Sequence, residues 1–146
     1  MQQRSDAGIA DIADIAGMTI GEAAGASGVT AKMIRHYEAI GLLRAPRRTG
    51  AGYRLYGEHD VRVLQFIRRG RALGFSLEQI KDLLALWEDK QRATADVRAL
   101  AQSHIVELDR KIAEMAAMRR TLESLAASCH GDERSDCPIL DDLAGR

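Results

Sequence analysis

The spacing of apolar residues predicts a chain made mainly of helices, beginning with a pair of short ones. Between residues 19 and 40 the apolar positions recur every three or four residues, with a break at Gly28. Glycine tolerates the positive φ that a tight turn between two steeply angled helices requires. Thr19 and Thr30 stand where a hydroxyl group can cap each helix, and Gly41 is suited to end the second. The pattern therefore indicates a helix-turn-helix.

The pattern changes between residues 42 and 56, where β-prone residues flank a glycine-rich turn. Gly50-Ala51-Gly52 separates two short runs, and the second run is Tyr53-Arg54-Leu55-Tyr56. Such an arrangement predicts a β-hairpin, which would form a wing beside the helix-turn-helix. Helical periodicity then returns and predicts two more helices, from 57 to 74 and from 76 to 87.

A single long helix is predicted from residue 94 to residue 127. Its apolar positions step by three and four residues, as in a coiled coil, and only Arg119 interrupts them. The seam consists of Ala101, Ile105, Leu108, Ile112, Met115, Leu122 and Ala126. At about 1.5 Å per residue the helix spans roughly 50 Å. No other segment is long enough to cover this seam, so we expect the same helix of a second chain to do so in a homodimer. Packing on the chain's own surface is the alternative.

These elements predict a mainly α fold with four parts. Residues 1–17 lack a packing pattern and are expected to form a flexible leader. Residues 18–88 are expected to form a winged helix-turn-helix domain, and residues 94–127 a long coiled-coil dimerisation helix. The family resemblance described below implies that the first is a DNA-binding domain and that the coiled coil is antiparallel. Residues 128–146 then form a short metal-binding loop and a C-terminal helix, for reasons given below.

The charge is zero overall but unevenly distributed. From Met18 to Phe75 there are ten basic and four acidic residues, whereas from Ser76 to Arg146 there are ten basic and fourteen acidic ones. A basic head joined to an acidic body is typical of a protein that binds a polyanion through its head. The alternative is that these charges only solvate exposed helix faces.

Several classes of protein are excluded by what the 146 residues lack. No apolar run approaches the roughly 18 residues of a membrane span, and no basic-then-apolar secretory signal is present, so we expect a cytoplasmic protein without membrane contact. No phosphate-binding loop and no nucleophile with a nearby base are evident, so we do not expect an enzyme.

Two cysteines, Cys129 and Cys137, lie close together near the C-terminus, with seven residues between them. In a reducing cytosol a disulfide is disfavoured, although a disulfide, a redox switch and inert thiols remain alternatives. We favour a soft-metal site, because thiolates select ions such as Cu(I), Hg(II) and Zn(II). Zinc normally takes four donors, whereas two thiolates alone suit a linear monovalent ion. His130 is a possible further ligand, although neighbours on a tight loop seldom converge on one ion.

Three segments together resemble the MerR family of bacterial transcription regulators. They are MTIGEAAGASGVTAKMIRHYEAIGLL, GAGYRLY and FIRRGRALGFSLEQIKDLL, followed by a long helix in the order typical of that family. Within the family, the tail CHGDERSDCPILDDLAG and the segment KQRATADV are similar to the copper-efflux (CueR-type) regulators.

The resemblance implies that the helix of residues 31–39 enters the major groove of dyad-symmetric promoter DNA. The side chains it implies as DNA contacts are Lys32, Arg35, Tyr37, Arg48, Tyr53, Arg54, Tyr56 and Arg71. Long cations and phenolic hydroxyls suit this role, because they neutralise phosphates and donate hydrogen bonds to them. For Tyr53 and Tyr56, packing of the wing against the head is the alternative.

For the sensor, the resemblance implies that Cys129 and Cys137 bind Cu(I), with Ag(I) or Au(I) as alternative effectors. Divalent-metal members of the family have a cysteine at the start of the long helix, where this chain has Thr94. The resemblance also implies that Arg98, one turn later, is a cation close to the metal site. Metal binding would distort the promoter so that RNA polymerase transcribes copper, silver or gold efflux or detoxification genes. A regulator that senses a divalent metal or the redox state is the alternative.

Overall fold

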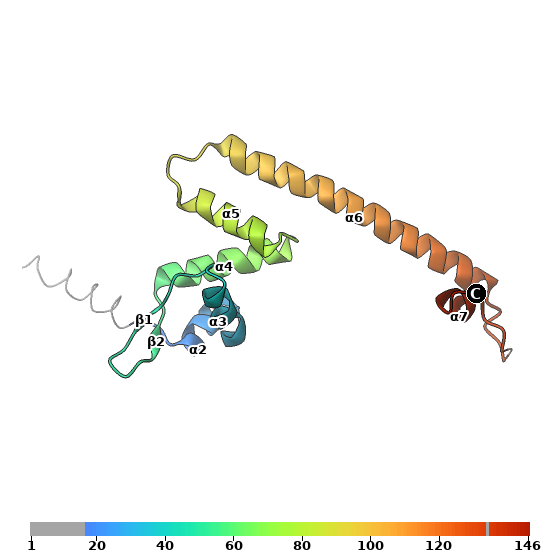
Figure 1. Cartoon of the computed structure of the whole chain (residues 1–146), viewed down its shortest axis with the longest axis horizontal. Coiled ribbons are helices and arrows are strands. Elements are labelled where there is room, and N and C mark those ends of the chain that lie inside the picture. The colour runs from blue at the N-terminus through green and yellow to red at the C-terminus, as the bar shows by residue number, and fades with distance from the viewer. Residues whose placement is uncertain (1–16, 134) are drawn as a thin grey trace, which may run out of the picture. The chain divides into compact units, whose positions relative to one another are not determined.

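The computed structural model describes residues 17–133 and 135–146, which form two compact units divided between Arg92 and Ala93 (Figure 1). The expected leader, residues 1–17, lies outside the described residues except for Gly17. Among the described residues, the first unit contains four helices and a two-stranded sheet, and the second contains two helices. Each unit is considered by itself.

The N-terminal unit begins with the expected helix-turn-helix. Its helices are α2 (Ile20–Ser27), α3 (Ala31–Ala39), α4 (Glu58–Ala72) and α5 (Leu77–Glu88). The Thr19 hydroxyl accepts a hydrogen bond from the backbone N–H of Glu22, and the Thr30 hydroxyl accepts one from that of Met33, each at 3.2 Å. Gly28 ends α2 with φ of +76°, so the predicted turn and both predicted caps are confirmed.

The core of this unit forms where α2 packs on α3 and α4, and where α4 packs on α5. Ala23, Ile34, Leu64, Ile67 and Ile80 are fully buried there. Gly70 allows α4 and α5 to pack closely, because a Cβ at this position would lie only 3.0 Å from the Ile80 side chain.

The predicted wing is also confirmed. Strands β1 (Arg47–Arg48) and β2 (Arg54–Leu55) pair antiparallel, with Arg48 opposite Arg54. Tyr56 extends the pairing to Met18 through two backbone hydrogen bonds of 2.7 and 2.8 Å. The wing is therefore joined to the segment that leads into α2.

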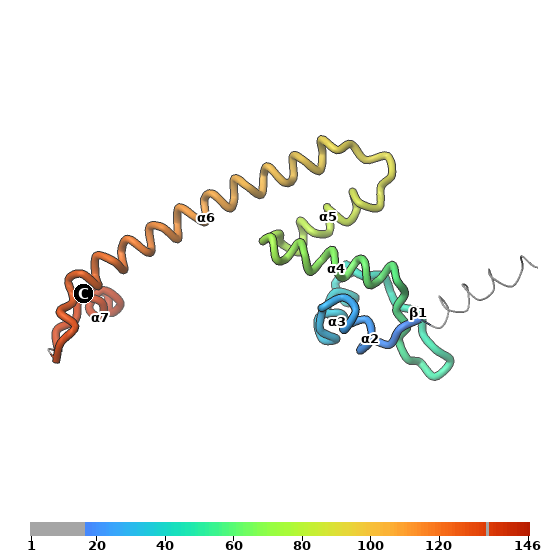
Figure 2. The backbone as a smooth tube through the Cα atoms, turned by 180° about the vertical axis from the view of Figure 1, so that it is seen from behind, coloured from blue at the N-terminus to red at the C-terminus, as the bar shows by residue number. Residues whose placement is uncertain are grey.

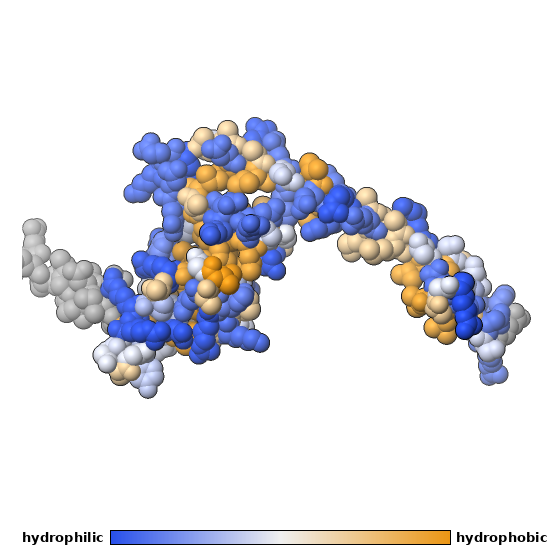
Figure 3. Space-filling view, in the orientation of Figure 1, coloured by the Kyte–Doolittle hydropathy of each residue, from blue (hydrophilic) through white to orange (hydrophobic). Residues whose placement is uncertain are grey.

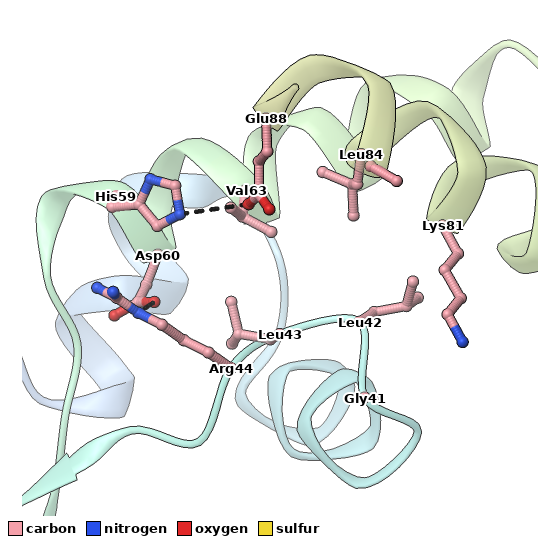
Figure 4. Close-up of a pocket in the computed structure, with 11 residues that line it drawn as sticks. Gly41, Leu42, Leu43, Arg44, His59, Asp60, Val63, Lys81, Leu84 and Glu88 are labelled. Carbon is pink, nitrogen blue, oxygen red and sulfur yellow. Dashed lines mark hydrogen bonds and ion pairs between the residues drawn. The ribbon is translucent and has the colours of Figure 1, made fainter. Parts of the chain in front are cut away.

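A buried carboxylate ties the loop after α3 to the start of α4. Asp60 is only 3% exposed; it accepts hydrogen bonds from the Gly57 backbone N–H at 2.8 Å and from the Arg44 Nε at 3.1 Å. Figure 4 shows this pair at one side of a pocket between α4 and α5, with His59 and Glu88 facing each other above it. The Asp60 contacts hold the chain in place just before it enters the wing.

The second unit consists of α6 (Thr94–Ser128) and α7 (Pro138–Leu143). The predicted long helix is therefore confirmed to within one residue. Figure 2 shows that α7 folds back beside the C-terminal end of α6, and the two helices are in contact. None of the helices in the described part of the chain combines the length and apolar character needed to cross a membrane.

The apolar seam of α6 is open along most of its length in the single chain. Ile105, Ile112, Met115 and Leu122 are between 54% and 66% exposed. Figure 3 shows hydrophobic residues at the surface of this unit. The chain itself thus leaves uncovered the residues that would form a coiled coil.

Replacing Asp60 with alanine is expected to lower the free energy of unfolding by about 2 kcal/mol, because a buried charge-assisted acceptor is removed. Glu58→Ala, an exposed acid in the same helical turn, should cost about 0.5 kcal/mol through the helix dipole. Urea denaturation of both variants measures the difference. Equal losses would show that Asp60 does not anchor this junction.

Candidate nucleic-acid interface and metal-binding loop

Helix α3 has one buried face and one exposed basic face. Ile34 and Tyr37 belong to the core, at 0% and 5% exposed, while Lys32 and Arg35 are exposed. This division follows from helical spacing, since residues three apart share a face. The exposed face therefore offers two cations to a ligand outside the unit.

A hollow at the junction of α2, α3 and the wing brings several predicted residues together. It is lined by Thr19, Ile20, Arg35, Arg48, Gly52, Tyr53 and Arg54. Three arginines thus line one small space, which also borders the N-terminus of α2. Free N–H groups and the helix dipole make such a terminus favourable for an anion. The arrangement is suited to binding a phosphate group.

Two of the three arginines on the strands of the wing are under mutual repulsion. Arg48 and Arg54 are direct neighbours across the sheet, and like charges in that position are destabilising. Arg48 is held by a hydrogen bond of 2.9 Å from its Nη1 to the Gly52 carbonyl oxygen. Tyr53, at the same turn, is 74% exposed. An anion bound in the hollow would relieve the repulsion and could accept a hydrogen bond from the Tyr53 hydroxyl.

A partly buried acid, Glu38, connects α3 to the second strand of the wing. Its carboxylate lies 3.2 Å from the Arg54 Nε and accepts a hydrogen bond from the Tyr56 hydroxyl. Burial of Tyr56, together with its bond to Glu38, raises the pKa of the phenol well above its usual range. Tyr56 therefore stays protonated and remains a donor to Glu38.

The structure corrects the expectation for two of the predicted DNA contacts. Tyr56 is 1% exposed and Tyr37 is 5% exposed, because both rings pack in the core of the head. Their burial leaves little of either ring exposed for contact with DNA. For Tyr56, the structure supports the alternative given from the sequence, in which this ring packs the wing against the head.

Two other predicted residues lie apart from the hollow. Arg71 is near the C-terminal end of α4, where its Nη1 donates to the Phe75 carbonyl oxygen at 3.1 Å. Lys32 is exposed on α3 but does not line the hollow. Sequence reasoning missed Thr19 and Ile20 as part of this site, although the capping threonine at a helix start is a signal that could have revealed them.

The two cysteines mark the two ends of one loop. Cys129 follows the last residue of α6, and its N–H donates to the Leu125 carbonyl at 3.1 Å; Cys137 directly precedes α7, and its carbonyl accepts from the Asp141 N–H at 3.0 Å. Both thiols are free and half-buried. Because α7 packs on α6, both ends of the loop are held at the same end of the long helix.

Among the described residues, this loop offers two thiols as strong metal ligands. Within the described residues, no group of three or more His, Cys, Asp or Glu side chains is placed to hold a metal ion. His130 is exposed and forms no such group with the cysteines. Thr94 and Arg98 begin the other end of α6, roughly 50 Å away at 1.5 Å per residue, so they cannot adjoin Cys129 of the same chain.

Comparison with known proteins agrees with this combination of head, long helix and loop. The model of the MerR HTH family of regulatory proteins matches residues 18–87, and the model described as MerR, DNA binding matches residues 61–125. A heavy metal-dependent transcription regulator 2 from Rhizobium meliloti (strain 1021) is 58% identical over 87% of this chain and 86% of its own length. The chain belongs to the MerR family.

Further members of the MerR family are similar over most of their length. The regulator CueR from Salmonella typhimurium (strain LT2) is 41% identical over 88% of this chain and 93% of its own. The crystal structure of PbrR691 from Ralstonia metallidurans CH34 in complex with lead(II) is similar with a TM-score of 0.74 and 36% identity, over 86% of this chain and 98% of that one. The matched MerR proteins are transcription regulators, and this chain is a regulator rather than an enzyme.

Removing a guanidinium from the hollow is expected to weaken DNA binding. Arg35→Ala and Arg48→Ala should each cost at least about 1 kcal/mol in binding free energy and reduce its salt dependence, because each variant neutralises fewer phosphates. Lys81→Ala, an exposed lysine of α5 outside the hollow, is the matched control. Titration of promoter DNA at several salt concentrations measures this. If all three variants bind alike, the hollow is not the DNA site.

Proposed function

We propose that this protein is a metal-responsive transcriptional activator that binds promoter DNA as a homodimer and senses a monovalent coinage-metal ion, with Cu(I) as the effector and Ag(I) or Au(I) as substitutes. The observation that carries the proposal is the loop with two free, half-buried thiols and no third strong ligand in the described residues. The resemblance of the tail to copper-efflux regulators and the similarity to a heavy-metal regulator and to CueR support the same conclusion.

The two cysteines fit a small, soft ion with a low coordination number. Cys129 and Cys137 would hold it, because thiolates are the preferred ligands of Cu(I) and related ions. The bound ion would supply a bond between the two ends of the loop. Since one end belongs to α6 and the other to α7, the loop can report its occupancy to the helix pair.

The seam of α6 supports an antiparallel homodimer. If two copies of α6 pack along their full length in opposite directions, residue 94 of one chain lies opposite residue 128 of the other. Thr94 and Arg98 of each chain would then lie beside the cysteine loop of its partner, which a single chain cannot achieve over roughly 50 Å. Each sensor would thus be completed by the start of the other chain's long helix, directly after that chain's DNA-binding head.

This arrangement connects metal binding to the shape of DNA. We expect both metal-free and metal-bound dimers to occupy the promoter, so that activation results from distortion rather than release. A change in the loop and α7 would shift the two heads relative to each other, and DNA held at Arg35, Arg48 and Arg54 would bend or untwist. Such deformation costs on the order of 1–6 kcal/mol, which the difference in metal affinity between the two states must supply. RNA polymerase would then find its two recognition elements correctly spaced.

A divalent-metal sensor is the second candidate, because one similar structure is described as a complex with lead(II). Thr94 argues against it for this chain. In the antiparallel dimer Thr94 is the residue nearest the partner's loop, and a hydroxyl group cannot supply the third thiolate that a divalent soft ion would require. A redox sensor through the same two thiols is tested by the metal experiment below.

The dimer is tested by placing charge in the seam. Leu108→Asp with Ile112→Asp should give monomers with much weaker promoter binding, because two buried carboxylates would oppose packing. Ser103→Asp with Ala117→Asp, on the opposite face of the same helix, is the matched control and should remain dimeric. Analytical ultracentrifugation distinguishes the two. A seam variant that stays dimeric contradicts the assignment.

The metal site is tested by stoichiometry on the reduced protein. We expect one Cu(I) or Ag(I) per subunit in competition with a chelator, and two sulfur neighbours by X-ray absorption. Cys129→Ser or Cys137→Ser should abolish binding and metal-induced transcription while leaving DNA affinity largely intact, and His130→Ala should retain the ion. Three or four donors, or preference for Zn(II) or Pb(II) over Cu(I), would refute the proposal; oxidation to a disulfide as the activating event would favour the redox sensor.

A further inference from the structure

Glu38 stands out in the head because it is an acid next to a surface that must bind a polyanion. Its side chain is 10% exposed, and its carboxylate contacts two groups of the wing, Arg54 and Tyr56. A carboxylate buried beside phosphates disfavours binding through repulsion and desolvation unless it is paired. Glu38 meets this condition through its contacts with Arg54 and Tyr56, and we therefore expect an acid at this position to have a functional reason.

The contact with Arg54 leaves part of that side chain available. Glu38 forms an ion pair with the guanidinium, with one carboxylate oxygen 3.2 Å from the Arg54 Nε. This nitrogen is buried and makes no hydrogen bond, whereas the Arg54 side chain as a whole is 33% exposed. A guanidinium carries five N–H donors in a rigid fork, so an ion pair on the Nε side leaves the two Nη groups for a bidentate anion. Arg54 also lines the hollow with Arg35 and Arg48.

The contact with Tyr56 fixes the position of Glu38 itself. The Tyr56 ring is fully buried, and its backbone pairs with Met18 at the entrance to α2. Glu38 is thus held between the C-terminal part of α3 and a strand end that does not move independently of the core. Tyr56 donates to one carboxylate oxygen of Glu38, and the other oxygen faces Arg54.

We propose that Glu38 is a positioning residue for DNA binding: it orients the Arg54 guanidinium toward a phosphate and fixes the wing relative to α3. The inference rests on the proposed DNA-binding function and adds a residue that itself touches no DNA. It also explains why a nearly buried acid lies among the ten basic residues of the head.

The test uses the dimeric full chain and a duplex that the wild-type protein selects from a random pool. In Glu38→Gln the amide retains an acceptor for Tyr56 but removes the charge that orients Arg54. We expect weaker binding and a slope of log K against log salt that is smaller by about 0.9 for each phosphate that is no longer neutralised, hence by about 2 for a dimer. Glu78→Gln, an exposed acid on α5, is the charge-matched control and should leave the slope unchanged.

A double-mutant cycle separates orientation from general stability. If Glu38 acts through Arg54, then Glu38→Gln has no further effect on affinity in an Arg54→Ala background. A loss of the same size in both backgrounds, or stronger binding by Glu38→Gln alone, overturns the proposal. Should Glu38→Gln fail to fold, Arg54→Lys provides the test. Its single ammonium group would be paired with Glu38, so we expect it to reduce the salt slope as much as Arg54→Ala does. A wild-type salt slope for Arg54→Lys would refute the role of the guanidinium fork.

The experiment also distinguishes failure of the positioning role of Glu38 from failure of the proposed DNA-binding function. If the wild-type protein selects no duplex over random DNA, the function is wrong and Glu38 has no such role. If it does select one and the Glu38 variants bind with the wild-type slope, only the positioning role is wrong.

Discussion

Hydrophobic side chains along α6 remain more than half exposed in the single chain, and burying the exposed part of each would be worth about 1–2 kcal/mol. That gain requires a second helix of similar length, and within the described residues only another copy of α6 provides one. In the proposed antiparallel pair, each cysteine loop would lie at the start of the other chain's α6, and so close to the other chain's head. The apolar seam would thus bring the metal-binding loop of one chain and the DNA-binding head of the other together in the dimer.

In the head, the important electrostatic interactions are those between neighbouring side chains of α3 and the wing. Three arginines line one hollow, two of them as direct neighbours across the wing, and their repulsion is tolerated because Glu38 and the Gly52 carbonyl each hold one guanidinium. The arginines are thereby arranged for an anion before it binds, which reduces the ordering cost of binding. Asp60 plays a comparable part on the other side of the wing, where it fixes the loop that leads into β1.

Periodicity and caps were sufficient to predict the helices, because hydroxyl caps and glycine turns are local signals: Thr19, Thr30 and Gly28 lie where expected. Burial of aromatic residues was not predictable in the same way. Tyr37 and Tyr56 have polar hydroxyls that suit DNA contact, and only the three-dimensional packing shows that both rings are inside. Glu38 was missed because its importance depends on residues 16 and 18 positions later in the chain. The exposed basic residues Arg35 and Arg48 could be proposed from sequence, whereas their convergence on one hollow could not.

Footprinting of promoter DNA with and without Ag(I) tests the central claim, that metal changes the shape of bound DNA rather than its occupancy. The account predicts protection of the same operator in both states, with altered cleavage at its centre only when the ion is present, and no such alteration for Cys129→Ser. Loss of protection on adding Ag(I), without any change at the operator centre, would contradict it.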